Sequence, residues 1–172
     1  CAGADLGGYG EVPGAEGLGP IPHNFHHQQR IAGLIPRLRR LRKPVIAAVE
    51  GPAVAGGMEL ALWCDIRVMA ESAYFGVYCR RWGVPLIDGG TVRLPRLVGM
   101  GKAQELLLTA RVILAEEAHE IGLVNAVVPA EALMGAAREM ALQMAACDPD
   151  VLTFARRLLH QGADLDMADA MQ

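Results

Sequence analysis

The sequence predicts an α/β fold in which short buried strands alternate with helices layered outside them. Two observations carry this prediction. Short apolar or β-branched runs alternate along the chain with segments whose apolar residues recur at helical spacing. The chain has 172 residues, of which 52% are hydrophobic, and this length suits one sizeable core better than two domains.

The first half of the chain contains six expected segments. Crowding by Gly and Pro predicts a loop, Pro36 breaks or kinks the helix that follows, and a β-branched run ended by Gly51 predicts a buried strand. The next helix is apolar on every side, which predicts burial all round. In order, the loop, helix, strand, helix and two short strands are expected over residues 7–24, 25–43, 44–51, 55–66, 67–70 and 73–77.

The second half is predicted to be mainly helical. Gly122 is expected to close one helix as its C-terminal cap. Asp148 is expected to cap the last helix, with Pro149 in its first turn. Two helices, a strand and two further helices are expected over residues 101–111, 115–122, 123–129, 130–147 and 148–162.

Charge and cysteine usage exclude several classes of function. The net charge is −3, which argues against a nucleic-acid surface built on bulk positive charge. No apolar run reaches the length of a membrane span, so no membrane association is expected. Four cysteines show neither CxxC pairing nor a His at metal spacing, which indicates free thiols in a reducing cytoplasm and no metal site.

Glu59 stands out, because it follows Gly56 and Gly57 inside an apolar segment, and a buried carboxylate is costly unless it is paired or used. The glycine pair leaves the N-terminus of the helix bare of side chains, so its N–H groups can stabilise an oxyanion. A carboxylate one turn further on could then move a proton on the bound group. The alternative is a Glu that only complements the helix dipole, which is the commoner role of such a residue.

Four segments together resemble the crotonase, or enoyl-CoA hydratase/isomerase, superfamily. They are "CAGADL", "KPVIAAVEGPAVAGGMELALWCDIRV", "FGVYCRRWGVPLIDGGTVRLPRLVG" and "EAHEIGLVNAVVP", in family order from Cys1 to about Pro149. The resemblance implies a spiral core of ββα units over residues 1–128 and a helical segment over residues 129–172. It also implies that strands before Cys1 and a longer C-terminal region are missing.

The resemblance further implies a thioester-bound substrate and an oxyanion hole made by the N–H groups of Ala4 and Gly56. Packing at a strand end is the alternative role of Ala2 and Leu6. The residues that the resemblance places next to the substrate or its coenzyme A are Ala2, Asp5, Leu6 and Gly57.

The chain departs from the hydratases at one catalytic position. They carry a second Glu three residues after the "FG" strand, where this chain has Cys79. Asp88 is the best substitute, because it precedes a Gly-Gly turn where dienoyl-CoA isomerases of the family also carry an Asp, although one residue out of register. The equally weighted alternative is that Asp88 caps a helix beginning near Gly90.

The sequence therefore predicts a cytoplasmic enzyme that hydrates an enoyl-CoA thioester or isomerises its double bond. Glu59 is the expected acid/base and Asp88 the candidate second group, with coenzyme A as part of the substrate and no bound metal or redox cofactor. A homo-trimer or homo-hexamer is expected. The alternative is a non-catalytic crotonase-fold protein that binds acyl-CoA or serves in assembly; RNA binding is a weaker one.

Overall fold

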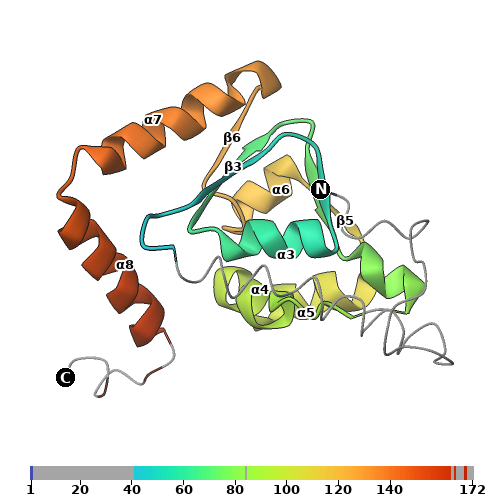
Figure 1. Cartoon of the computed structure of the whole chain (residues 1–172). Helices are drawn as coiled ribbons and strands as arrows, with labels where there is room; N and C mark the ends of the chain where they lie inside the picture. Colours follow the sequence, from blue (N-terminus) through green and yellow to red (C-terminus); the bar gives the residue numbers. More distant parts are fainter. Residues whose placement is uncertain (2–40, 84, 164, 166–168, 170–172) are drawn as a thin grey trace, which may run out of the picture.

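A computed structural model describes Cys1, residues 41–83, residues 85–163, Leu165 and Asp169. Within this part of the chain, helices surround two small β-sheets, as the α/β prediction requires (Figure 1). The predicted loop over residues 7–24 lies outside the described residues. The predicted helix over residues 25–43 is described only in its last three residues, which are not helical.

The two sheets have three strands each. The first is fully parallel in the order β1-β3-β6, and the second has the order β2-β4-β5, with β2 parallel and β5 antiparallel to β4. β1 leads into β2 and β3 into β4, so the chain crosses from the first sheet to the second before α3 and again before η2 and α4. The strands are β1 Ile46–Val49, β2 Pro52–Val54, β3 Ile66–Ala70, β4 Tyr74–Gly76, β5 Val112–Leu114 and β6 Ala126–Val128.

The helices from Met100 onward agree with the predicted ranges to within a few residues. The side chain of Asp148 accepts hydrogen bonds from Asp150 N and Val151 N and thereby caps the last helix, as predicted. Gly122, with φ 73°, follows the helix that it was expected to close. The α-helices are α3 Gly56–Trp63, α4 Gly90–Val98, α5 Met100–Thr109, α6 Ala115–Glu120, α7 Leu133–Ala145 and α8 Pro149–Gly162, and the 3₁₀ turns are η2 Tyr78–Trp82 and η3 Ala130–Ala132.

Two predictions fail locally. Leu60 is 43% exposed, so α3 is not buried on every side as expected. The strands β2 and β5 were not predicted. The division of the chain at residue 128 stays a prediction.

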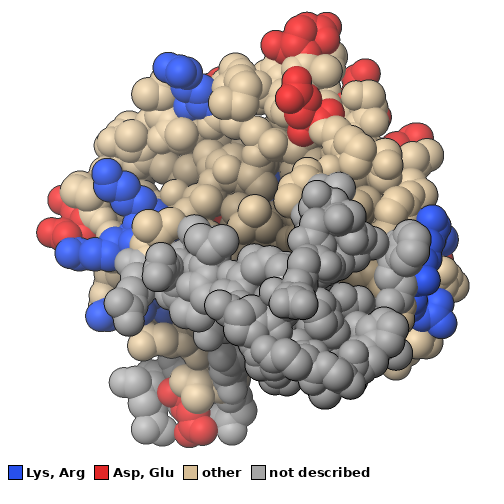
Figure 2. Space-filling model, turned by 45° about the vertical axis from the view of Figure 1, so that its right-hand side comes forward, with Lys and Arg blue, Asp and Glu red and all other residues tan. Residues whose placement is uncertain are grey.

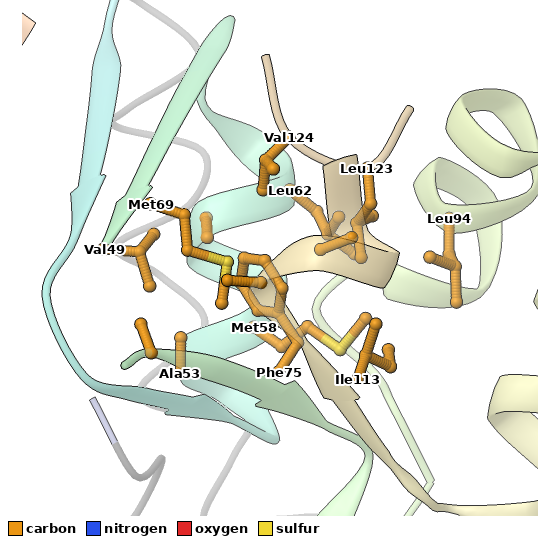
Figure 3. Close-up of a cluster of buried hydrophobic side chains, with 14 of the residues drawn as sticks. Val49, Ala53, Met58, Leu62, Met69, Phe75, Leu94, Ile113, Leu123 and Val124 are labelled. Atoms are coloured by element: carbon orange, nitrogen blue, oxygen red, sulfur yellow. The ribbon is translucent and has the colours of Figure 1, made fainter. Parts of the chain in front are cut away.

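The core lies between the sheets and α3. Met58 of α3 points toward Phe75 of β4 and Ile113 of β5, and all three side chains are fully buried (Figure 3). Met69 of β3 approaches the same cluster from the first sheet (Figure 3). This packing holds α3 in a fixed position against both sheets.

A buried arginine fixes the other end of α3. Arg67, on β3, is 4% exposed, and its guanidinium donates to the carbonyl oxygens of Cys64 at 2.5 Å and Leu123 at 2.8 Å. Cys64 is the C-cap residue of α3, whose last carbonyls lack partners within the helix. A cation at this end also complements the helix dipole.

α8 is joined to the body of the molecule through Asp65. The Asp65 carboxylate accepts from Arg156 Nε at 2.9 and 2.8 Å and from Val45 N at 2.8 Å, and it lies 3.2 Å from His160 Nε2. Burial opposes ionisation of Asp65, but the hydrogen bonds from Arg156 and Val45 outweigh it and lower the pKa of the carboxyl. The ion pair is thus part of what holds α8 in place.

Charged side chains do not form one continuous patch on the face seen in Figure 2. Lys and Arg lie mainly at the left and right edges of this face, and most of the Asp and Glu lie at its top, with others at the left edge and at the bottom (Figure 2). Among the described residues, no helix has the length and apolar character needed to cross a membrane.

Replacing Arg156 by Leu is expected to lower the free energy of unfolding by about 2 kcal/mol at pH 7, because hydrogen bonds to a charged, partly buried partner are lost. Stability from Asp65 is present above its unfolded pKa of about 4 and is lost as pH falls through its lower folded pKa. The difference from the parent should therefore shrink below about pH 4. Urea unfolding at several pH values measures it. Arg157→Leu, at an exposed position of the same helix, is the control; equal losses in both variants would contradict this role of Arg156.

Candidate active site

Glu59 lies in the first turn of α3, and its side chain is almost completely buried, with 2% exposure. The backbone N–H of Glu59 donates to Ala55 O, so the residue continues the regular helix. The sequence therefore identified a buried carboxylate correctly. The groups that bind this carboxylate come from a part of the chain about 30 residues further on.

Two backbone N–H groups hold the Glu59 carboxylate. Glu59 Oε1 accepts from Asp88 N at 2.9 Å and from Gly90 N at 2.8 Å. Gly90 is the first residue of α4 and follows Gly89, whose φ of 92° requires the left-handed region that glycine favours. The carboxylate thus sits at the N-terminus of α4, where the helix dipole favours negative charge. Glu59 therefore does more than complement the dipole of its own helix, which was the alternative role considered for it.

The surroundings of Glu59 bring its proton affinity close to neutral pH. Burial raises the pKa of the carboxyl, the hydrogen bond from Gly90 lowers it, and the negative charge of Asp88 raises it, with a result of about 7. A group with this pKa is present in both protonation states near pH 7. It can therefore accept a proton and return it, which is the property of an effective general acid/base.

Asp88 acts on Glu59 through its backbone N–H and through its negative charge. Its side-chain Oδ1 is buried and has no hydrogen-bond partner within the described part of the chain. The alternative role as a helix cap is wrong, because Gly89 is the N-cap of α4 and no side chain caps this helix from that position. Burial raises the pKa of Asp88, and the charge of Arg93 opposes this effect.

Cys79, in η2, lies near Glu59 but does not replace a carboxylate. The thiol is buried, and burial, followed by the negative charge of Glu59, raises its pKa to about 11. It therefore stays protonated at neutral pH and cannot serve as a base there. Near pH 7 the Cys79 side chain therefore places no charge beside Glu59.

The start of the chain lies beside the N-terminus of α3. Cys1 O accepts from Val54 N at 3.0 Å, and the Cys1 amino group donates to Pro52 O at 2.7 Å. A Cβ on Gly57 would collide with the Cys1 carbonyl, which explains the glycine there. Gly56, the predicted member of the oxyanion hole that lies within the described residues, is the first residue of α3. The remaining predicted contacts, Ala2, Ala4, Asp5 and Leu6, lie outside the described residues.

Sequence reasoning missed the residues that shape the turn before α4. Arg93 Nη1 donates to Asp88 O at 2.8 Å and passes over Gly89, where a Cβ would collide with the guanidinium. The signal was present as a Gly-Gly pair followed by Arg at the third position. Within the described part of the chain, no three His, Cys, Asp or Glu side chains gather so as to hold a metal ion.

The fold and site define an α/β protein with two sheets, a helix N-terminus bare of side chains and a buried acid/base carboxylate beside it. A family model described as enoyl-CoA hydratase/isomerase matches residues 1–172. The chain belongs to the enoyl-CoA hydratase/isomerase family, and the predicted crotonase-type fold is confirmed by its solved relatives.

Several relatives show how much of the family the chain covers. It is 44% identical over 135 residues to a short-chain-enoyl-CoA hydratase of Clostridium acetobutylicum, covering 78% of this chain and 52% of the relative. The crystal structure of an enoyl-CoA hydratase from Bacillus anthracis has a TM-score of 0.88 and 38% identity, over 100% of this chain and 64% of that one. A monofunctional enoyl-CoA isomerase from M. smegmatis has a TM-score of 0.75 and 40% identity, over 81% and 66%. The chain thus spans about half to two thirds of the length of these relatives.

Replacing Asp88 by Asn is expected to lower the pKa of Glu59 below about 7, because a negative charge that disfavours the ionised form is removed while the Asp88 N–H remains. Titration of the Glu59 carboxyl by ¹³C NMR measures the change, with the signal assigned by its loss in Glu59→Gln. Asp148→Asn, which keeps a good capping residue on α8 far along the chain, is the control. An unchanged or raised pKa in Asp88→Asn would contradict this electrostatic coupling.

Proposed function

We propose that this chain provides the catalytic site for an enoyl-CoA thioester, acting by double-bond isomerisation or by hydration. The observation that carries the proposal is the buried carboxylate of Glu59, with a pKa of about 7, one turn into a helix whose N-terminus begins at Gly56. Membership of the enoyl-CoA hydratase/isomerase family supports the substrate class.

In the proposed isomerisation, Glu59 takes a proton from C2 of a 3-enoyl thioester. The electron pair of the broken C–H bond moves onto the thioester oxygen, and the enolate is stabilised by the N–H groups of Gly56 and Ala4. Glu59 then returns the proton to C4, so the double bond moves to C2=C3 and no atom is gained or lost. One carboxylate that changes its protonation state twice is sufficient for this reaction.

In the proposed hydration, a water oxygen bonds to C3 of a 2-enoyl thioester and a proton is added at C2. One carboxylate can take the water proton and deliver it in turn, but two groups share these steps more readily. Since the Cys79 thiol stays protonated near neutral pH, Asp88 is the candidate second group. Its buried, unpartnered Oδ1 is where a water or a substrate group could be held.

The proposed contacts to the substrate come from the segment that follows Cys1 and from the start of α3. Cys1 lies against β2. Coenzyme A would enter as part of the substrate, and no separate cofactor is proposed. The residues proposed to lie along the thioester and its coenzyme are Ala2, Asp5, Leu6 and Gly57. Four free thiols support a reducing, cytoplasmic location.

Turnover tests the proposal directly. The chain is incubated with a 2-enoyl-CoA and, separately, with a 3-enoyl-CoA, and the products are resolved by chromatography. Formation of 3-hydroxyacyl-CoA or of the shifted double bond supports catalysis. Tight binding of acyl-CoA with no product from either substrate would favour the rival interpretation, a non-catalytic acyl-CoA-binding or assembly protein.

Glu59→Gln is expected to lower kcat by about 10²–10⁴-fold, because the amide keeps the shape of the side chain but cannot accept the proton. Affinity for acyl-CoA should stay within a few-fold of the parent. Steady-state kinetics and calorimetric titration with acyl-CoA measure the two quantities. Glu71→Gln, outside the site, is the control. Turnover by Glu59→Gln at the rate of the parent would show that the role of Glu59 is only structural.

We also expect self-association into a homo-trimer or homo-hexamer. Val151, Phe154 and Leu158 are exposed at helical spacing on α8, so this helix presents an apolar stripe away from the Asp65 contact. Light scattering should give three or six times the mass of one chain. Phe154→Glu should shift the protein toward smaller species, whereas Arg157→Glu should do so less. A parent that stays monomeric at micromolar concentration would refute the expectation.

A further inference from the structure

Gly90 has no room for a side chain. A Cβ built on Gly90 would lie 2.9 Å from both Cγ and Oε1 of Glu59 and 2.8 Å from Cδ1 of Leu86. Non-bonded carbon atoms normally approach no closer than about 3.5 Å. Any side chain at this position must therefore displace both neighbours.

The backbone conformation is not the reason for the glycine. Gly89 needs its positive φ of 92°, but Gly90 is a regular residue of α4 with no positive φ. Alanine is the better helix former at such a position, so local propensity would favour a side chain. A side chain at position 90 is excluded by the close contact of Gly90 with Glu59 of α3.

The two neighbours differ in how easily they can move. Leu86 presents the far end of a flexible side chain, which can change rotamer. The Glu59 carboxylate is held at 2.9 and 2.8 Å by Asp88 N and by Gly90 N itself. A Cβ on Gly90 would push against the atom that its own N–H binds, so the hydrogen bonds and the side chain are incompatible.

We propose that Gly90 is a positioning residue for proton transfer: its missing side chain lets the Glu59 carboxylate rest on the first N–H of α4, with Oε1 occupied by the two amides and Oε2 left to exchange the proton. This inference rests on the proposed function of Glu59. The other described titratable or charged groups that act on Glu59 are Asp88, from the loop before α4, Arg93, from α4, and Cys79, from η2.

Gly90→Ala is expected to lower kcat by about 100-fold, since a displacement of the carboxylate by about 1 Å misaligns the transfer. KM should change by no more than a few-fold. The kinetic limb that reports Glu59 should move to higher pH, because the Gly90 hydrogen bond that lowers the pKa is weakened. Parental kcat together with an unmoved pH profile would overturn the proposal.

Gly101→Ala is the matched control. Gly101 is the second residue of α5, follows a positive-φ glycine at position 99, and has open space where its Cβ would lie. Its substitution should leave kcat and the pH profile unchanged. A similar loss of activity in both variants would count against a specific role of Gly90.

A stability cycle tests the steric contact between Gly90 and Glu59, on which the inference depends, independently of turnover. Gly90→Ala should lower Tm by at least about 3 °C in the parent, but not in a Glu59→Ala background, where the Cβ finds space. If Gly90→Ala alone fails to fold, folding of the double variant supports the contact, and its failure overturns it. An inactive parent would refute the proposed function, while this cycle would still report on Gly90.

Discussion

The hydrogen bonds from Asp88 N and Gly90 N to one oxygen of Glu59 are the interaction on which the site depends. Burying an isolated carboxylate is strongly unfavourable, and these two N–H groups offset part of that cost. An arginine in their place would hold the group ionised at any physiological pH. Two amides at a helix N-terminus stabilise the charge without a full opposite charge, so burial still dominates and the proton remains exchangeable near pH 7. The same contact joins α3 to α4.

α3 is suited to hold such a group because both of its ends are tied to other elements. At the N-terminal end the helix packs against Cys1 through Gly57 and against α4 through Glu59. At the C-terminal end the buried Arg67 donates to the carbonyl oxygen of Cys64, the C-cap residue. The acidic residue near the start and the cation at the end both complement the dipole. A helix fixed in this way can present its first N–H groups without reorganisation, which is what stabilisation of an oxyanion requires.

Local patterns sufficed to predict much of the fold and one half of the site. Asp148 and Pro149 begin α8 as predicted, and Glu59 was identified because it interrupts an apolar run. The partners of Glu59 could not be found in this way, since they lie 29 and 31 residues further along the chain and contribute backbone atoms, which no side-chain pattern reveals. The capping role considered for Asp88 was wrong for a related reason: the N–H of Gly90, the first of α4, is bound by the distant Glu59 carboxylate. Leu60 was misjudged because composition alone does not tell which side of a helix meets solvent.

Cys79 changes the electrostatics of the site as well as its chemistry. A second carboxylate in η2 would place a like charge beside Glu59 and raise its pKa further. The buried thiol instead stays neutral near pH 7, which leaves Asp88 as the negative group that raises the proton affinity of Glu59 among the described residues. Among the described residues, the negative charge that acts on Glu59 thus comes from the turn before α4, where Arg93 moderates it. Because Asp88 and Gly90 also supply the amides that hold Glu59, one turn sets both the position and the proton affinity of the carboxylate. Changes in this turn should therefore alter geometry and pH dependence together, whereas changes at Cys79 that keep the residue neutral should leave the protonation of Glu59 largely as it is.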